Sequence, residues 1–302
     1  MLDMYLNKII CEDNVSFCKR LPNNSIDMIL TSCPYDDLRD YNSYIFDFES
    51  LAHEMYRILK EGGVLIWVVN DATVKYSLTL TSMRQAIYFI DDVGFKMHDV
   101  MGYGKVNPLP SNMIRKKYAS SYEYMFVLKK GNMPKTFNPI KTKNKWAGIK
   151  AGLAQRGKDG VMPKKTIIVN DTKIKENFWF YESEDYIFDP NLWYYDVGYN
   201  LTTTDKIAYE HPAIFPEALA RDHIKTWTNP GDIVFDPFMG AGTTGKMALL
   251  LDRYYIGTDI SEKYCEIARK RCDIYSRQYD MFSEIQKTNN NETNMEIFDD
   301  KG

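Results

Sequence analysis

The segment from residue 232 to 259 constrains the fold of this chain more than any other. It reads as a short apolar strand, "DIVFD", a glycine-rich turn, "PFMGAGTTG", an apolar helix, "KMALLLD", and a second strand, "YYIGTD". Gly240, Gly242 and Gly245 have the G-x-G-x-x-G spacing, which is meaningful where a strand precedes it and a helix follows. Glycines let the backbone turn tightly there, and the N–H groups at the start of a helix face a ligand. The pattern predicts a β-α-β unit that binds a nucleotide-like cofactor.

Two cofactors fit this turn, a nicotinamide dinucleotide and S-adenosylmethionine. Asp259 ends the strand that follows the helix, and a carboxylate at this place can accept both hydroxyls of an adenosine ribose. Asp236, directly before the glycines, offers a carboxylate that suits a cationic amino-acid group but not a pyrophosphate. The unit also lies late in the chain, whereas a dinucleotide fingerprint usually opens its domain. Both features favour S-adenosylmethionine.

Apolar patterns alternate between strands and helices through most of the chain. Continuous apolar runs predict strands, and 3.6-residue periodicity predicts helices. The strands are expected at 7–11, 25–32, 64–69 and 122–130, and the helices at 15–21, 44–63, 77–94, 217–227 and 261–277. Gly62 and Gly63 are expected to end the helix over 44–63. This alternation predicts an α/β fold with a parallel sheet flanked by helices.

A basic region interrupts the alternation between about residues 131 and 205. Residues 129–175 hold thirteen Lys and Arg but only two acids, a net charge of +11, in a chain whose formal net charge is −3. The lysines interleave with aromatic residues such as Phe137 and Trp146. A basic patch in an otherwise acidic chain is typical of a protein that binds a polyanion, so the region predicts nucleic-acid binding. A solvated loop is the competing interpretation.

Composition narrows the setting in which the chain works. The apolar runs are too short to span a bilayer, and the N-terminus lacks a signal-peptide pattern, so a cytoplasmic protein without a membrane partner is expected. Five cysteines form no C-x-x-C pair, which argues against a disulfide or zinc framework. The four histidines have no metal-ligand spacing, so no metal is expected.

A second motif, "TSCPY" at residues 31–35, ends an apolar strand. Together with "DPFMGAGTT" at 236–244, it resembles the motifs of the beta-group amino DNA methyltransferases, which carry Asp/Asn/Ser-Pro-Pro-Tyr/Phe in the catalytic loop. The segments "EDNVSFCKRLPNNSIDMIL" (12–30) and "HPAIFPEALARDHI" (211–224) are also similar to that family, and the motif order is the beta-group order. The departures are Glu12 in place of a glycine and Cys33 in place of the first proline.

This resemblance implies a Rossmann-like, mostly parallel, seven-stranded methyltransferase sheet that uses S-adenosylmethionine. Residues 1–130 would form the catalytic half, 131–205 the target-recognition region, 206–278 the cofactor-binding half and 279–302 a flexible tail. The cofactor-binding residues would be Asp13, Pro212, Phe215, Asp236, Phe238, Gly240, Gly242, Thr243, Thr244 and Asp259. For Asp13 an N-cap of the next helix is the alternative, for Phe238 a core aromatic, and for the two threonines a helix cap.

The catalytic loop would consist of Ser32, Cys33, Pro34 and Tyr35. An exocyclic base amine is a poor nucleophile, and two acceptors on its N–H bonds can aim its lone pair at a methyl group. The Ser32 hydroxyl and the backbone carbonyl of Cys33 have the spacing for this, while Tyr35 can stack on a base rotated out of the duplex. The alternative for Cys33 is covalent attack on C6 of cytosine, although carbon-5 enzymes use the order Pro-Cys.

The predicted activity is site-specific methylation of double-stranded DNA as in a restriction-modification system, with N4 of cytosine favoured by Ser32 and N6 of adenine next. Phosphate contacts are expected from Lys141, Lys143, Lys145 and Arg156. A cognate restriction endonuclease and a homodimer remain open partners. The alternatives are a protein or RNA methyltransferase with a Pro-Tyr loop, and a catalytically dead DNA-binding module.

Overall fold

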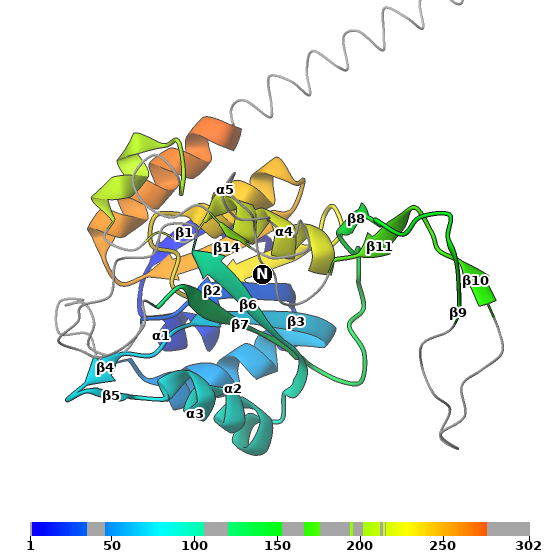
Figure 1. Cartoon of the computed structure of the whole chain (residues 1–302). Helices are drawn as coiled ribbons and strands as arrows, with labels where there is room; N and C mark the ends of the chain where they lie inside the picture. The colour runs from blue at the N-terminus through cyan, green and yellow to red at the C-terminus, as the bar shows by residue number, and fades with distance from the viewer. Residues whose placement is uncertain are drawn as a thin grey trace, which may run out of the picture.

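The structure is a computed structural model, which describes residues 2–34, 46–105, 120–152, 166–175, 194–195, 202–211, 214 and 216–276. The predicted tail, residues 279–302, lies outside these ranges. The described chain forms a central twisted sheet with helices on both faces, and a narrow arm projects from one side (Figure 1).

The main sheet has eight strands among the described residues, in the order β1-β14-β13-β2-β3-β7-β6-β12. Their bounds are β1 Lys8–Cys11, β2 Ile26–Ser32, β3 Leu59–Val69, β6 Lys96–Lys105, β7 Tyr122–Lys129, β12 Tyr194–Tyr195, β13 Ile233–Asp236 and β14 Tyr254–Asp259. The first five strands in the spatial order are parallel, and β7 is antiparallel to both β3 and β6. The predicted mostly parallel sheet is confirmed, with the two-residue β12 added to seven longer strands.

Helices cover each face of the sheet and enclose two apolar clusters. On one face lie α1 (Asn14–Cys18), α2 (Phe48–Ile58) and α3 (Thr81–Tyr88), the last continued by a π-helical turn at Phe89–Val93. On the other lie α4 (Glu217–Trp227), α5 (Thr243–Leu250) and a final helix over residues 262–276. Short 3₁₀ turns span Leu2–Tyr5 and Lys206–Glu210. Strand residues alternate between the two clusters, because successive side chains point to opposite faces.

Two predicted helices are shorter than expected. The helix predicted over 44–63 ends at Ile58, and β3 begins at the next residue, so Gly62 and Gly63 lie in the strand and do not cap the helix. Gly62 has φ +77°, and Lys135 donates its backbone N–H to the Gly62 carbonyl at 2.8 Å. The first residues of the helix predicted over 77–94 instead form a hairpin of β4 (Thr73–Val74) and β5 (Ser77–Leu78). Strand pairing and tertiary contact override the local pattern at both places.

The basic region begins as a two-part arm. Its base is a ladder of β8 (Lys141–Lys143) with β11 (Thr172–Ile174), and its outer part is a ladder of β9 (Lys150–Gly152) with β10 (Thr166–Ile168). The arm is visible on the right of Figure 1, away from the β4–β5 hairpin that follows the end of β3. It is attached by Asn138, whose side-chain amide donates to the carbonyls of Lys225 and Thr228 near the start of β13.

The direction of the connections changes between β13 and β2. From β2 the chain passes through α2 to β3 on one side, whereas from β13 it passes through α5 to β14 on the other. Open α/β sheets bind ligands in the crevice at the carboxyl ends of strands where the order reverses in this way. The carboxyl ends of β2 and β13 therefore mark the expected site.

Candidate active site

The two predicted motifs meet at this edge of the sheet. Ser32 is the last residue of β2, and Asp236 is the last residue of the neighbouring β13. Asp259 ends β14 on the far side of β13. The parallel pairing places the catalytic loop and the cofactor loop side by side, although some two hundred residues separate them in the sequence.

A hydrogen-bonded carboxylate joins the two motifs. Asp236 is fully buried, and its Oδ1 accepts the Thr31 hydroxyl at 2.6 Å and the Phe238 N–H at 3.0 Å. Its Oδ2 accepts the Thr244 hydroxyl at 2.6 Å. Burial raises the pKa of Asp236 to about 6, and the bonds from Thr244 and Thr31 oppose that rise. Asp236 thus holds the end of β2 and the glycine turn together, a role that the motif alone did not indicate.

Asp259 has a more open carboxylate. Its Oδ2 accepts the Gly240 N–H and its Oδ1 the Ser261 N–H, each at 2.9 Å. Burial raises its pKa, and the backbone N–H groups oppose the rise. A carboxylate oxygen has two lone pairs, so each oxygen retains acceptor capacity for a hydroxyl. This geometry fits the predicted contact with a ribose.

The glycine turn is close-packed on its inner side. Gly240 and Gly242 have φ +50° and +80°, in the left-handed region that other residues rarely adopt. A Cβ on Gly240 would lie 3.0 Å from the His211 ring, and one on Gly242 would lie 2.9 Å from Ala268 of the final helix. The glycines are therefore required by packing as well as by any ligand that approaches the turn.

Ser32 and Cys33 face opposite sides of the sheet. The Cys33 side chain is 3% exposed, and its Sγ lies 3.9 Å from the Val68 carbonyl and 4.0 Å from Oε1 of Gln85. Gln85 also accepts the indole N–H of Trp67 at 2.9 Å. The thiol belongs to the apolar cluster under α2 and α3. Its burial disfavours the covalent alternative, because a base would have to enter that cluster to reach it.

Aromatic side chains line the same edge. Phe238 contacts Phe46 edge to face, with ring centroids 5.1 Å apart, so the core-aromatic interpretation describes its packing in this structure. Tyr124 pairs with Val69 at the end of β3, stacks on Phe126 and has its hydroxyl 3.4 Å from that of Tyr122. That hydrogen bond and burial raise the pKa of Tyr124 to about 12. Sequence reasoning missed both tyrosines, because it treated their strand as part of a parallel sheet, whereas β7 runs antiparallel.

Other predicted cofactor residues make internal contacts. Asp13 caps α1, with its Oδ1 accepting the Ser16 N–H at 2.9 Å, as its alternative interpretation proposed. Thr244 bonds to Asp236, and the Thr243 hydroxyl accepts from Arg271 at 3.4 Å, so neither hydroxyl caps α5. Pro34 follows Cys33 at the edge and is half-buried. Tyr35, Arg156, Pro212 and Phe215 lie outside the described residues.

The predicted DNA-binding lysines lie away from this edge. Lys141, Lys143 and Lys145 are exposed at the base of the arm, which joins the body beside the amino ends of β3 and β13. The seven residues of β2 separate that side from Ser32 by roughly 20 Å, at about 3.3 Å per residue. The structure therefore does not bring the lysines together with the catalytic loop.

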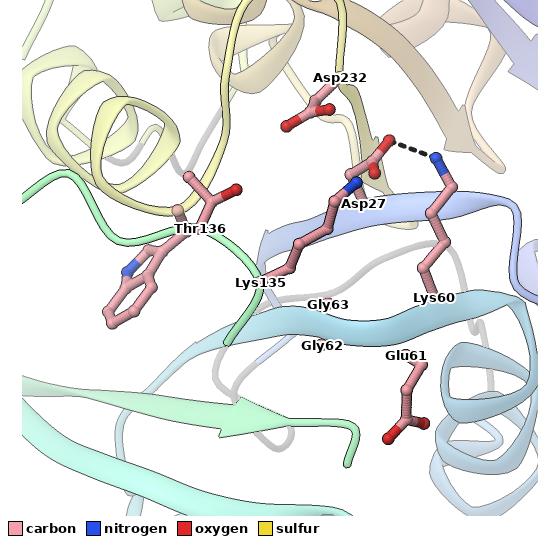
Figure 2. Close-up of a pocket in the computed structure, with 9 residues that line it drawn as sticks. Asp27, Lys60, Glu61, Gly62, Gly63, Lys135, Thr136 and Asp232 are labelled. Atoms are coloured by element: carbon pink, nitrogen blue, oxygen red, sulfur yellow. Dashed lines mark hydrogen bonds and ion pairs between the residues drawn. The ribbon is translucent and has the colours of Figure 1, made fainter. Parts of the chain in front are cut away.

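A small cavity at the amino edge is also remote from the site. Figure 2 shows Asp27 paired with Lys60, near Lys135 and Asp232, and the Asp27–Lys60 ion pair measures 2.7 Å. The cavity has a volume of about 10 Å³, roughly the space of one water molecule. It lies at the starts of β2 and β3, where it is too small for a cofactor or a base.

No helix within the described ranges is long and apolar enough to cross a membrane. Among the same residues, no group of three or more His, Cys, Asp or Glu side chains is placed to hold a metal ion.

Comparisons with known proteins agree with this architecture. The orphan methyltransferase M.BamHII of Bacillus amyloliquefaciens is 45% identical over 265 residues, which cover 86% of this chain and 91% of that protein. The DNA adenine methyltransferase YhdJ of Escherichia coli K12 is 28% identical, with 86% and 80% covered. The solved PvuII cytosine-N4-specific DNA methyltransferase has the same fold, with a TM-score of 0.60, 19% identity and 89% and 91% covered. Residues 26–270 match the DNA methylase family of N6 and N4 methyltransferases. The chain therefore belongs to this family of amino DNA methyltransferases.

Proposed function

We propose that this protein transfers a methyl group from S-adenosylmethionine to the exocyclic amine of a base in double-stranded DNA, with N4 of cytosine as the first candidate. The Thr31–Asp236 bond supports this best, because it joins the end of the Ser32 strand directly to the glycine turn. A base held at Ser32 and a cofactor held at the turn would then be neighbours. S-adenosylmethionine-bound structures of two family-like folds, M1.HpyAVI and TTHA0409, support the choice of cofactor.

The described residues suit two tasks in this reaction. Asp259 and the glycine turn hold the adenosine part of the cofactor, which supplies an electrophilic methyl group when bound. The Ser32 hydroxyl and the Cys33 carbonyl accept the two amine N–H bonds, so that the nitrogen lone pair turns toward the methyl group. The buried Cys33 thiol takes no covalent part, and its backbone carbonyl serves as a proline carbonyl would.

Ser32 favours cytosine over adenine as the target, and N6 of adenine is the second candidate. We assign residues 1–130 and 206–278 to the methyltransferase domain and 131–205 to target recognition. Because Lys141, Lys143 and Lys145 lie at the edge opposite Ser32, we assign them phosphate contacts on the duplex away from the target base.

Mass spectrometry of nucleosides tests this function. Plasmid DNA is incubated with the purified protein and S-adenosylmethionine that carries a deuterated methyl group, then digested to nucleosides. Labelled N4-methyldeoxycytidine is the expected product, and the Ser32→Ala variant serves as the control. Labelled N6-methyldeoxyadenosine would reverse the choice of base, whereas 5-methyldeoxycytidine, or label found in RNA or protein alone, would refute the proposed amine chemistry or substrate.

A further inference from the structure

Behind the glycine turn lies a cluster of four buried charges. Lys246 of α5 bonds to Asp205 and Glu217, each at 2.8 Å, and Arg271 of the final helix bonds to the same two carboxylates at 2.9 and 2.6 Å. Arg271 is fully buried and Lys246 is 3% exposed. Two cations thus face two anions, and the group carries no net charge.

Arg271 differs from the other members because it also bonds to the turn. Its Nη1 donates to the Ala241 carbonyl at 2.6 Å and to the Thr243 hydroxyl at 3.4 Å. Ala241 lies between Gly240 and Gly242, and Thr243 is the first residue of α5. A single planar guanidinium therefore connects the turn to the two carboxylates, a fixed fork of donors that a lysine ammonium cannot reproduce.

The surrounding helix leaves the turn little freedom to move. Ala268 lies directly under Gly242, and the thiol of Cys272 lies under Gly245, so that a Cβ on either glycine would meet it at 2.9 Å. Residues 268, 271 and 272 lie on one face of the helix, because positions three and four apart are neighbours. The Arg271 bond fixes the orientation of the Ala241–Gly242 peptide on top of this face, and Asp259 fixes the neighbouring Gly240 N–H from the other side.

We propose that Arg271 is a positioning residue for the cofactor, acting through the Ala241 carbonyl to hold the glycine turn in its binding conformation. The proposal rests on the assignment of the turn as the S-adenosylmethionine site. Arg271 does not touch the cofactor in this mechanism. Its effect is on cofactor affinity, and DNA binding and the amine-polarising loop are independent of it.

The test compares Arg271→Lys with Tyr275→Phe. Tyr275 donates its hydroxyl to Asp205 at 2.8 Å, so its removal weakens the same cluster without touching the Arg271–Ala241 bond. For each folded variant, calorimetry measures the Kd of S-adenosylmethionine and of S-adenosylhomocysteine, filter binding measures the Kd of DNA, and thermal unfolding measures stability. We expect Arg271→Lys to raise both cofactor Kd values about tenfold to a hundredfold, which corresponds to the loss of one charge-assisted hydrogen bond. The DNA Kd should stay within about twofold of the wild-type value.

Tyr275→Phe should lower the unfolding temperature while the cofactor Kd stays within about twofold. Equal rises of the cofactor Kd in both variants, or an unchanged Kd in Arg271→Lys, would overturn the proposal and leave Arg271 a purely structural residue. If Arg271→Lys does not fold, the charge-balanced Arg271→Gln/Glu217→Gln variant is compared with Glu217→Gln alone, and equal cofactor affinity in these two overturns it as well. A wild-type protein that binds neither cofactor would instead refute the assignment of the site.

Discussion

Replacing Thr31 by Val tests the bond that joins the two halves of the site. Thr31 is fully buried, and its hydroxyl donates to the carboxylate of Asp236 at 2.6 Å. Valine keeps the β-branched shape that suits the strand, so the change removes the hydrogen bond with little change of volume. The Asp236 carboxylate then loses one of its three donors in a site where water cannot replace it.

The size of the effect depends on the charge of Asp236. A hydrogen bond to a charged group contributes about 1.5–3 kcal/mol, and one to a neutral group about 1 kcal/mol. Because burial raises the pKa of Asp236 to about 6, the carboxyl is charged at pH 7.5 and mostly protonated at pH 5. The variant should therefore lose about 1.5–3 kcal/mol of unfolding free energy at pH 7.5 and about 1 kcal/mol at pH 5.

The sign of the pH dependence follows from the raised pKa. The folded state binds the Asp236 proton more tightly than the unfolded state, so this group's contribution to stability is present at low pH. It is lost as the pH rises through the folded pKa of about 6. Removal of the Thr31 hydroxyl raises that pKa further, because the hydroxyl favours the charged form. The deficit of the variant is thus complete only above its own, higher pKa.

Urea unfolding of both proteins at pH 5 and pH 7.5 measures these differences. Thr258→Val is the matched control, because Thr258 is equally buried and its hydroxyl donates to the neutral Pro237 carbonyl at 3.0 Å. The control should lose about the same free energy, about 1 kcal/mol, at both pH values. A Thr31→Val deficit that does not grow between pH 5 and pH 7.5, or that matches the control at both, would refute the argument that the bond is to a buried charge.

Four further predictions concern the site and the arm. Ser32→Ala should lower single-turnover methylation about 10²–10³-fold with the cofactor Kd unchanged, because the hydroxyl would act on the amine alone; near-wild-type rates would remove it from the mechanism. Cys33→Ser and Cys33→Pro should both stay active, and loss of activity in both together with a trapped adduct on 5-fluorocytosine DNA would make the thiol a nucleophile. Asp259→Ala should weaken cofactor binding in calorimetry by about 1.5–3 kcal/mol for each lost hydrogen bond, and unchanged affinity would contradict the ribose contact. Filter binding over a salt series should show a slope flatter by about 0.9 for each lost phosphate contact, and an unchanged slope would favour a solvated arm, when glutamine replaces Lys141, Lys143 and Lys145.

Much of the fold could be predicted from local patterns. The helix predicted after Pro216 is α4, and the strand–turn–helix–strand over 232–259 forms as expected, because each element has a strong period and a clear start or stop signal. Gly62 and Gly63 misled the prediction, because a glycine pair after a helical pattern signals a C-cap as readily as an irregular strand. Only the pairing of β3 with β2 and β7 decides between the two.

The contacts of the site could not be predicted in the same way. The motifs named Asp236 and Asp259, and parallel strands place their ends at one edge of a sheet. Nothing in the sequence showed that Asp236 would be enclosed by Thr31 and Thr244, or that Arg271 would hold Ala241. Such bonds join residues from separate elements, and their partners depend on how the helices pack on the sheet.

The sequence by itself therefore determined the family, the order of the motifs and the strand ends that carry them, because these follow from local periodicity and turn chemistry. The tertiary structure decided which way the side chains face and what they contact. It placed the Cys33 thiol in the core and the lysines of the arm beside the edge opposite Ser32. Strand direction, register and packing are set by long-range burial of apolar surface, and no short segment of a sequence carries that information.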